Sequence, residues 1–368
     1  MTSTQESPHD ITAPPHPLLP TPAPVQLIDP AGAAVGPAPD RETLLRLYRA
    51  MVIGRRFDTQ ITALTRQGRL AVYPSSRGQE ACQIGAALAL RAQDWLFPTY
   101  RDSVAVLTRG VDPLQVLVSF RGDWHCGYDP YEHRVAPQCT PLATNTLHAV
   151  GLAHAARLRR EDTVALVLLG DGATSEGDTH EALNFAAVWK APVVFLVQNN
   201  GYAISVPLAK QSAAPSLAHK GIGYGIPSHL IDGNDVAAVH TTVSEAVQHA
   251  AAGHGPVLIE ALTYRVEAHT NADDATRYRQ DEEVAFWLER DPLRRLELFL
   301  NRDGQEPPTE FAAEAEALAA AVRAGTNADT APDPAGLFGH VYAEPTAALH
   351  QQQADLLDEI ARDEEARA

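Results

Sequence analysis

Two short apolar runs, each followed at once by a polar turn that contains glycine, constrain this chain more than any other feature. Residues 164–169 (VALVLL) lead into GDG at 170–172, and residues 193–197 (VVFLV) lead into QNNG at 198–201. An unbroken apolar run of this length is typical of a strand buried on both faces of a parallel sheet. Ligands of open α/β sheets collect at the carboxyl ends of such strands. The sequence therefore predicts an α/β fold, mainly a parallel sheet flanked by helices, with a ligand site at these turns.

The side chains of the first turn indicate a metal ion as well as an anion. Free backbone N–H groups in a turn that precedes a helix suit a phosphate group. Yet Asp171 adds a carboxylate at this place, and a carboxylate repels phosphate unless a divalent cation lies between them. Magnesium binds carboxylate, amide and phosphate oxygens. We therefore expect a magnesium ion that bridges protein oxygens to a diphosphate.

The sequence partly matches three other ligand-binding motifs, but it lacks an essential residue of each. Residues 172–179 have the outline of a P-loop, but Asp178 replaces the lysine that would neutralise a nucleotide phosphate. A dinucleotide fingerprint would need a glycine in place of Ser175. The pair His180-Glu181 begins a zinc motif in which Asn184 replaces the second histidine. A plain strand-to-helix turn without a ligand is the simplest alternative, and the second polar turn weakens it.

Composition excludes several classes of protein. The 368 residues carry a formal net charge of −17, which argues against a nucleic-acid binder because such a protein needs a basic face. No stretch is apolar enough to cross a bilayer, and the N-terminus lacks the features of a secretory signal. The three cysteines, Cys82, Cys126 and Cys139, form no CxxC pair, so neither a zinc site nor a disulfide framework is indicated. The cytoplasm is the expected compartment.

The chain divides into three parts by composition. Residues 1–39 form a Pro-rich N-terminal extension, disordered or loosely draped over 1–24, with a small hairpin at 25–35. Residues 40–305 form the α/β domain, and residues 306–368 form a helical tail with an alanine-rich helix, a Pro/Asp/Gly linker and a charged terminal helix.

Inside the domain, a long helix is expected from the N-cap Asp40 to Gly68. The other expected elements are a helix at 79–90, a small-residue helix at 143–156, strands at 164–169, 193–197 and 257–260, a polar loop at 267–274 and a helix at 281–301.

The two polar turns together match the thiamine-diphosphate motif, in which GDG and NN each follow a strand. Either half alone is a weak signal, but both at this spacing are specific. Asp171 and Asn200 supply hard oxygen ligands, and the backbone carbonyl of Tyr202 supplies a third. Two diphosphate oxygens and a water would complete an octahedron around Mg²⁺.

The match extends well beyond the motif. Residues 170–205, GDGATSEGDTHEALNFAAVWKAPVVFLVQNNGYAIS, resemble the alpha subunit of the thiamine-dependent 2-oxo acid dehydrogenases, which include pyruvate and branched-chain members. Shorter matching stretches lie at 78–81, 99–102, 141–144 and 264–269, and the resemblance covers about residues 40–300. It implies a thiamine-diphosphate-binding fold with helical N- and C-terminal extensions.

The resemblance also implies roles for particular residues. Tyr100 and Arg101 match residues that bind the diphosphate, Leu142 matches a main-chain contact to the aminopyrimidine, and Arg265 and His269 match a pair near the phosphates and the reacting carbon. We expect His269 to be catalytic. The implied cofactor-binding set is Tyr100, Arg101, Leu142, Gly170, Asp171, Gly172, Ala173, Asn200, Tyr202, Ile204, Arg265 and His269.

At three further positions the resemblance is weaker, or this sequence departs from the family. Thr144 lies in a stretch that binds a structural potassium ion in some members of the family. Gln198 stands where some branched-chain members have arginine, so one phosphate-facing charge is missing. Thr270 occupies the place of a serine that is phosphorylated in mitochondrial relatives.

The implied activity is decarboxylation of a small 2-oxo acid with transfer of the acyl group to a lipoyl arm of an acyltransferase core. The carboxylate that activates the aminopyrimidine comes from a separate beta subunit in this family, which implies an alpha2-beta2 heterotetramer. Residues 140–156 (TPLATNTLHAVGLAHAA) and 176–178 look more like the branched-chain enzymes than like pyruvate dehydrogenase. Two other interpretations stay open: a self-sufficient thiamine enzyme such as a transketolase, and a non-catalytic nucleotide-binding or scaffolding subunit.

Overall fold

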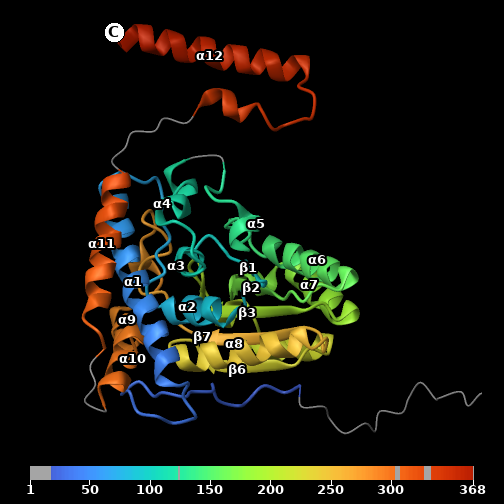
Figure 1. Cartoon of the computed structure of the whole chain (residues 1–368), viewed down its shortest axis with the longest axis vertical. Coiled ribbons are helices and arrows are strands. Elements are labelled where there is room, and N and C mark those ends of the chain that lie inside the picture. Colours follow the sequence, from blue (N-terminus) through green and yellow to red (C-terminus); the bar gives the residue numbers. More distant parts are fainter. Residues whose placement is uncertain (1–17, 123–124, 303–306, 327–332, 368) are drawn as a thin grey trace, which may run out of the picture.

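The structure, a computed structural model, describes residues 18–122, 125–302, 307–326 and 333–367 (Figure 1). Its centre is a five-stranded, fully parallel sheet in the order β1-β2-β3-β7-β6. The strands are β1 (Trp95–Phe97), β2 (Ala165–Gly170), β3 (Val193–Asn199), β6 (Ser228–Asp232) and β7 (Val257–Leu262). The parallel sheet predicted from the sequence is therefore confirmed. A separate two-stranded ribbon joins β4 (Tyr202–Ala203) and β5 (Val206–Pro207).

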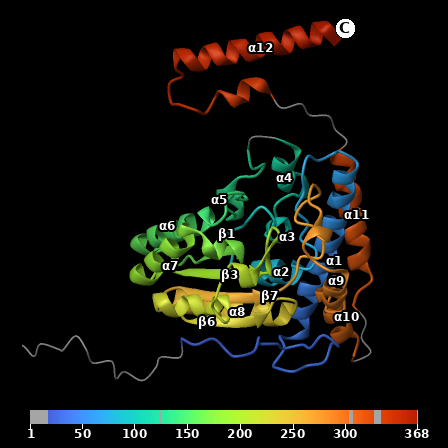
Figure 2. The ribbon, with the colours of Figure 1, turned by 180° about the vertical axis from the view of Figure 1, so that it is seen from behind.

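Both faces of the sheet are covered, which explains the unbroken apolar runs. Successive side chains of a strand point to opposite faces. Leu166 and Leu168 belong to a core with side chains of α1, α2 and α8, whereas Val167 and Leu169 belong to a second core with α6 and α7. Figure 2 shows α6 and α7 on one side of the sheet and α8 on the other. The result is a three-layer α/β/α arrangement.

The helices predicted from the sequence are present except near residue 291. The helix bounds are α1 (Arg41–Arg66), α2 (Glu80–Ala89), α3 (Ser103–Thr108), α4 (Pro113–Val116), α5 (Pro130–His133), α6 (Thr144–Arg159), α7 (Gly177–Trp189), α8 (Val236–Ala251), α9 (Asp281–Leu288), α10 (Pro292–Asn301), α11 (Glu310–Gly325) and α12 (Ala347–Arg367). The single helix expected at 281–301 is wrong. Asp291 caps a new helix that has Pro292 in its first turn, so α9 ends before it and α10 begins after it.

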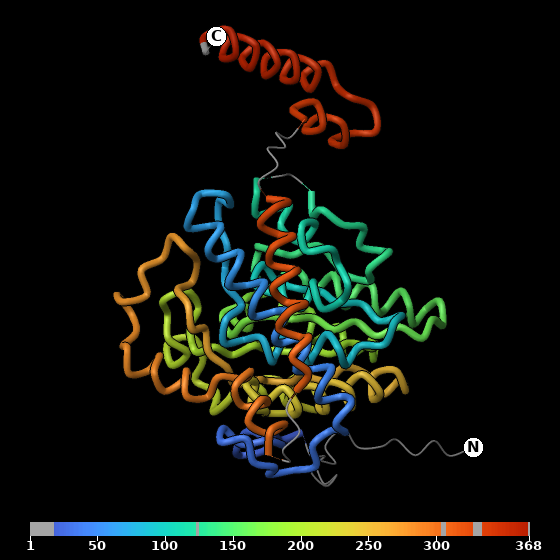
Figure 3. Tube along the Cα trace, turned by 60° about the vertical axis from the view of Figure 1, so that its left-hand side comes forward, coloured from blue at the N-terminus to red at the C-terminus, as the bar shows by residue number. Residues whose placement is uncertain are grey.

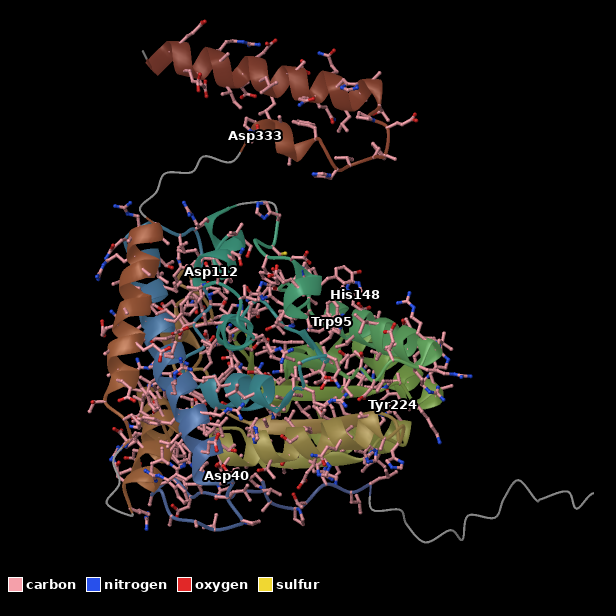
Figure 4. The ribbon with its side chains drawn as sticks, viewed as in Figure 1. Asp40, Trp95, Asp112, His148, Tyr224 and Asp333 are labelled. Atoms are coloured by element: carbon pink, nitrogen blue, oxygen red, sulfur yellow. The ribbon has the colours of Figure 1, made fainter. Side chains whose placement is uncertain are left out.

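The long N-terminal helix α1 begins as predicted. Asp40, labelled in Figure 4, accepts a hydrogen bond from the backbone N–H of Thr43 at 2.8 Å. The predicted apolar stripe of α1 is buried, namely Leu44, Leu47, Tyr48, Met51, Phe57, Ile61 and Leu64. The alanine-rich helix α11 packs along α1 (Figure 3). Ion pairs from Arg49 to Glu314 and from Arg56 to Glu316 join the two helices.

The segments at both ends differ from the predictions in part. Within residues 25–35 the chain turns back on itself, and one antiparallel bridge joins Ile28 to Ala34, so the expected hairpin is reduced to a single bridge without named strands. Val25 instead pairs in parallel with Ile231 at the edge of the sheet. Residues 1–17 lie outside the described part of the chain, as does most of the expected linker, 327–332. The terminal helix α12 is present and lies apart from the main body (Figure 1).

Candidate active site

The site lies where the carboxyl ends of four parallel strands meet. Tyr100 and Arg101 follow β1, Asp171 follows β2, Asn200 follows β3, and Arg265 follows β7. Gly170 pairs with Gln198 across β2 and β3, so the turns that leave these two strands emerge next to each other. The fold thus brings together residues that are up to 165 positions apart only because their strands are neighbours.

One cavity of about 790 Å³, part of it open to solvent, is lined by every residue of the predicted cofactor-binding set. These are Tyr100, Arg101, Leu142, Gly170, Asp171, Gly172, Ala173, Asn200, Tyr202, Ile204, Arg265 and His269. Sequence reasoning missed several other lining residues, namely Gln79, Thr99, Cys139 and Asn145. Gln79 and Thr99 lie within stretches that carried the resemblance, which was the available signal for them.

Asp171 is a buried carboxylate whose burial outweighs the hydrogen bonds and the Arg265 charge that stabilise its ionised form. It is 1% exposed, and its Oδ2 accepts a hydrogen bond from Gln211 Nε2 at 2.8 Å. Burial raises the pKa of this carboxyl group, while the Gln211 hydrogen bond acts against the rise. A negative charge held here is therefore destabilised unless a cation binds next to it.

The glycine of the same turn leaves room for a close approach. A Cβ atom on Gly172 would lie 2.8 Å from the Cβ of Ala203, the second residue of β4. Gly172 therefore lets the turn after β2 pack directly against the turn after β3. This packing brings Asp171 near the backbone of Tyr202, which precedes Ala203.

Arg101 and Arg265 both converge on the ring of His269. Arg101 Nη2 lies 3.0 Å from His269 Nδ1 and donates to the His269 carbonyl oxygen, and Arg265 Nη1 lies 3.3 Å from the same Nδ1. Both guanidinium groups are buried, 5% and 2% exposed. A guanidinium group can only donate, so Nδ1 accepts and the proton of the neutral ring lies on Nε2. Burial, with Arg101 and Arg265 nearby, lowers the pKa of His269 to about 4.

The cavity is suited to an anion and a cation together. Within the described residues, neither Arg101 nor Arg265 forms an ion pair with a carboxylate, and the buried Nε of Arg265 has no hydrogen-bond partner. Buried charges that lack partners are costly. A diphosphate would pair with the arginines, and a divalent cation would pair with Asp171. The residues present therefore fit both groups.

The metal ligands proposed from the sequence could not hold a metal without oxygens from elsewhere. In the described ranges, no group of three His, Cys, Asp or Glu side chains comes together as a metal site. Asn200 Oδ1 and Asp171 lie in the same cavity, so amide, carbonyl and ligand oxygens would have to complete the coordination. This is the donor set expected for magnesium bound to phosphates.

Thr144 is not among the residues that line the cavity. It begins α6, and its Oγ1 lies 3.5 Å from Asp178 Oδ2. The preceding residue Ala143 lines the cavity and has a φ of 66°. The potassium site expected near Thr144 stays a prediction.

The comparisons with known proteins agree on one family. The family described as dehydrogenase E1 component matches residues 48–335. A 3-methyl-2-oxobutanoate dehydrogenase subunit alpha of Mycobacterium tuberculosis is 48% identical over 350 residues, covering 92% of this chain and 95% of that protein. The pyruvate dehydrogenase E1 component subunit alpha of Acholeplasma laidlawii is 37% identical and covers 85% and 92%. That of Staphylococcus aureus is 41% identical over 76% and 77%.

The resemblance found in the sequence is thereby confirmed, and so is the thiamine-dependent class that it implied. In the part of the chain that the structure describes, no helix is both long and apolar enough to span a membrane. The chain belongs to the dehydrogenase E1 component family, whose members depend on thiamine diphosphate.

Proposed function

We propose that this chain is the alpha subunit of a branched-chain 2-oxo acid dehydrogenase and acts on substrates of the 2-oxoisovalerate type. The observation that carries this proposal is the pairing, in one cavity, of a buried carboxylate with two buried arginines that have no acidic partner among the described residues. That pattern calls for a divalent cation and a diphosphate. The relative with the highest identity reported above is a 3-methyl-2-oxobutanoate dehydrogenase subunit alpha, which favours the branched-chain class over pyruvate.

The cofactor would be held by residues from four strand ends. Asp171, Asn200 Oδ1 and the carbonyl of Tyr202 would bind Mg²⁺, and Arg101, Arg265 and Tyr100 would bind the diphosphate. Leu142 and Ile204, which are 43% and 55% exposed, would contact the rings of the cofactor. When bound, thiamine diphosphate supplies the nucleophile and the electron sink for decarboxylation of a 2-oxo acid.

His269 would act as a neutral hydrogen-bond donor. Its Nδ1 accepts from two arginines and so is blocked as a base. Its Nε2–H remains to donate to an oxygen that gains negative charge during the reaction, which is a common way to lower a barrier. A pKa of about 4 keeps the imidazole uncharged at neutral pH.

The cavity lacks one chemical group that the reaction needs. Among the described residues that line it, Asp171 is the sole acid, and it is committed to the metal. The carboxylate that activates the aminopyrimidine would therefore come from a beta subunit, as in an alpha2-beta2 heterotetramer, and a lipoyl-bearing acyltransferase core would accept the acyl group. Potassium near Thr144 and a cytoplasmic location belong to the same proposal.

The substrate can be tested directly. The chain is co-expressed with its beta subunit, and turnover is compared on pyruvate and on the three branched-chain 2-oxo acids with an artificial electron acceptor. We expect kcat/KM for 2-oxoisovalerate to exceed that for pyruvate by at least about tenfold, the discrimination that one or two methyl groups allow. A preference for pyruvate would replace the branched-chain assignment with pyruvate dehydrogenase.

A further inference from the structure

A line of buried amides connects the proposed metal ligand Asn200 to a carboxylate that lies outside the metal site. Asn200 Nδ2 donates to Gln79 Oε1 at 3.1 Å, Gln79 Nε2 donates to Gln198 Oε1 at 3.2 Å, and Gln198 Nε2 donates to Asp102 Oδ1 at 2.7 Å. All four side chains are at most 7% exposed, so they exchange few hydrogen bonds with water. We call these four residues the amide relay.

The direction of the amide relay is fixed at its Asp102 end. Burial raises the pKa of Asp102, and the hydrogen bonds from Thr99 and Gln198 act against that rise. In its ionised form this side chain can only accept hydrogen bonds. The other oxygen of Asp102 accepts from the backbone N–H and the hydroxyl of Thr99, at 2.7 and 2.6 Å. Gln198 must therefore present its NH₂ group to Asp102 and its oxygen to Gln79. Each amide in turn then has one permitted orientation.

The orientation matters most at the far end. Because Asn200 gives its NH₂ group to Gln79, its oxygen is left for other partners, and it already accepts from the Tyr202 N–H at 3.1 Å. A reversed amide would offer NH₂ instead, and an NH₂ group cannot bind a cation. The Tyr202 N–H and the Asp102 carboxylate thus favour the same orientation of Asn200, the first directly and the second through two glutamines.

We propose that Asp102 is a positioning residue for the magnesium site and that it acts through the amide relay, together with the Tyr202 N–H, to hold the oxygen of Asn200 toward the metal. This inference rests on the proposed function, because it assigns Asn200 to Mg²⁺. It adds two glutamines and one carboxylate to the machinery of the site, none of which touches the metal.

The relay predicts a specific pattern of substitutions. In Asp102→Asn, the fixed Thr99 N–H holds the new amide oxygen, so the new NH₂ group faces Gln198 and favours the reversed orientation of every amide up to Asn200. There the reversed orientation conflicts with the Tyr202 N–H, which donates to Asn200 Oδ1. In Gln198→Glu, two carboxylates face each other. In the double variant, the carboxylate introduced at position 198 accepts from Gln79 and from the amide introduced at position 102. The original orientation of Asn200 then returns with no change in net charge.

The test uses the alpha–beta complex and two readouts. Magnesium affinity is measured by calorimetry at saturating thiamine diphosphate, and the melting temperature is measured without cofactor. We expect each single variant to weaken magnesium binding about 10–100-fold and to melt lower, and the double variant to recover both to within about threefold and a few degrees. Asp94→Asn, which alters another fully buried carboxylate, is the control and should not rescue Gln198→Glu.

The outcomes separate this inference from the proposed function. A double variant that melts no higher than the worse single variant overturns the relay, whether or not cofactor binds. An unaltered complex that binds thiamine diphosphate without magnesium overturns the proposed function, and the melting temperatures of the cofactor-free variants still decide on the relay.

Discussion

Nη2 of Arg101 lies 3.0 Å from Nδ1 of His269, so a buried cation directly contacts the imidazole that we expect to take part in catalysis. Arg265 approaches the same nitrogen at 3.3 Å. The two arginines disfavour a positive charge on His269 and fix its tautomer. The residues proposed to hold the diphosphate therefore also set the chemical state of the histidine.

The first prediction concerns the pH dependence of His269. Its pKa is lowered to about 4 from 6.5, so the unfolded chain binds more protons than the folded chain between these values. The contribution of His269 to the free energy of unfolding is therefore largest above pH 6.5, and it is lost as the pH falls toward 4. Mass spectrometry of deuterium exchange at the imidazole C2 position in the cofactor-free complex should give a pKa close to about 4. A pKa near 6.5 would show that the arginines do not act on the ring.

His269→Ala should separate turnover from cofactor binding. The lost Nε2–H donor is expected to lower kcat by at least about 100-fold, with little change in the Kd for thiamine diphosphate. His269→Gln, whose amide NH₂ can reach the same region, should recover part of the loss. The control is His254→Ala, which alters an exposed histidine beyond the end of α8. A variant with normal kcat and weak cofactor binding would make His269 a binding residue only.

Asp171→Asn should abolish cofactor binding without lowering the stability of the cofactor-free complex. Burial raises the pKa of Asp171, so its charge destabilises the cofactor-free fold. The neutral amide should keep or raise the melting temperature of the cofactor-free complex and should abolish magnesium-dependent binding of thiamine diphosphate. Differential scanning fluorimetry with and without both ligands measures the two effects together. A large drop in the melting temperature without cofactor would instead indicate a structural role.

Arg295 should contribute to stability and not to the site. It is 2% exposed, binds Asp232 Oδ2 at 2.8 Å and donates to the Ile28 carbonyl oxygen, which joins the N-terminal segment to β6 and α10. Arg295→Ala would remove the cation from two carboxylates, Asp232 and the buried Asp235, which would keep only neutral hydrogen-bond donors. We expect a loss of about 3–5 kcal/mol in the free energy of unfolding, measured by urea titration. The Kd for thiamine diphosphate should stay within about twofold, and a larger change would contradict this separation.

The parts of the fold that have a long pattern could be predicted from the sequence. The runs that form β2, β3 and β7 are clear because burial on both faces gives an unbroken apolar run, and the stripe of α1 is clear because burial on one face gives a helical period. Strand β1 has three residues and β6 begins with Ser228 and His229, so neither shows such a pattern. The break at Asp291-Pro292 does carry a local signal that the predicted single helix ignores, because proline favours the first turn of a helix.

The sequence could predict which residues share the cavity of the candidate site, but not the contacts between their side chains. Asp171 and Asn200 follow strands, so their convergence follows from strand adjacency. The contact of Arg101 with His269 spans 168 positions, and no local pattern encodes it. The amide relay likewise joins the residue before α2, the end of β3 and the turn before α3, so the partners of Gln79 and Gln198 appear only once the sheet is assembled.

The central claim is that one divalent cation joins Asp171, Asn200 and Tyr202 to the diphosphate. The most direct measurement is anomalous X-ray scattering from a crystal of the alpha–beta complex grown with thiamine diphosphate and Mn²⁺ in place of Mg²⁺. The account predicts one strong peak at bonding distance from an Asp171 carboxylate oxygen, Asn200 Oδ1 and the Tyr202 carbonyl oxygen. A peak bound elsewhere, or diphosphate held in this cavity with no metal beside Asp171, would contradict it.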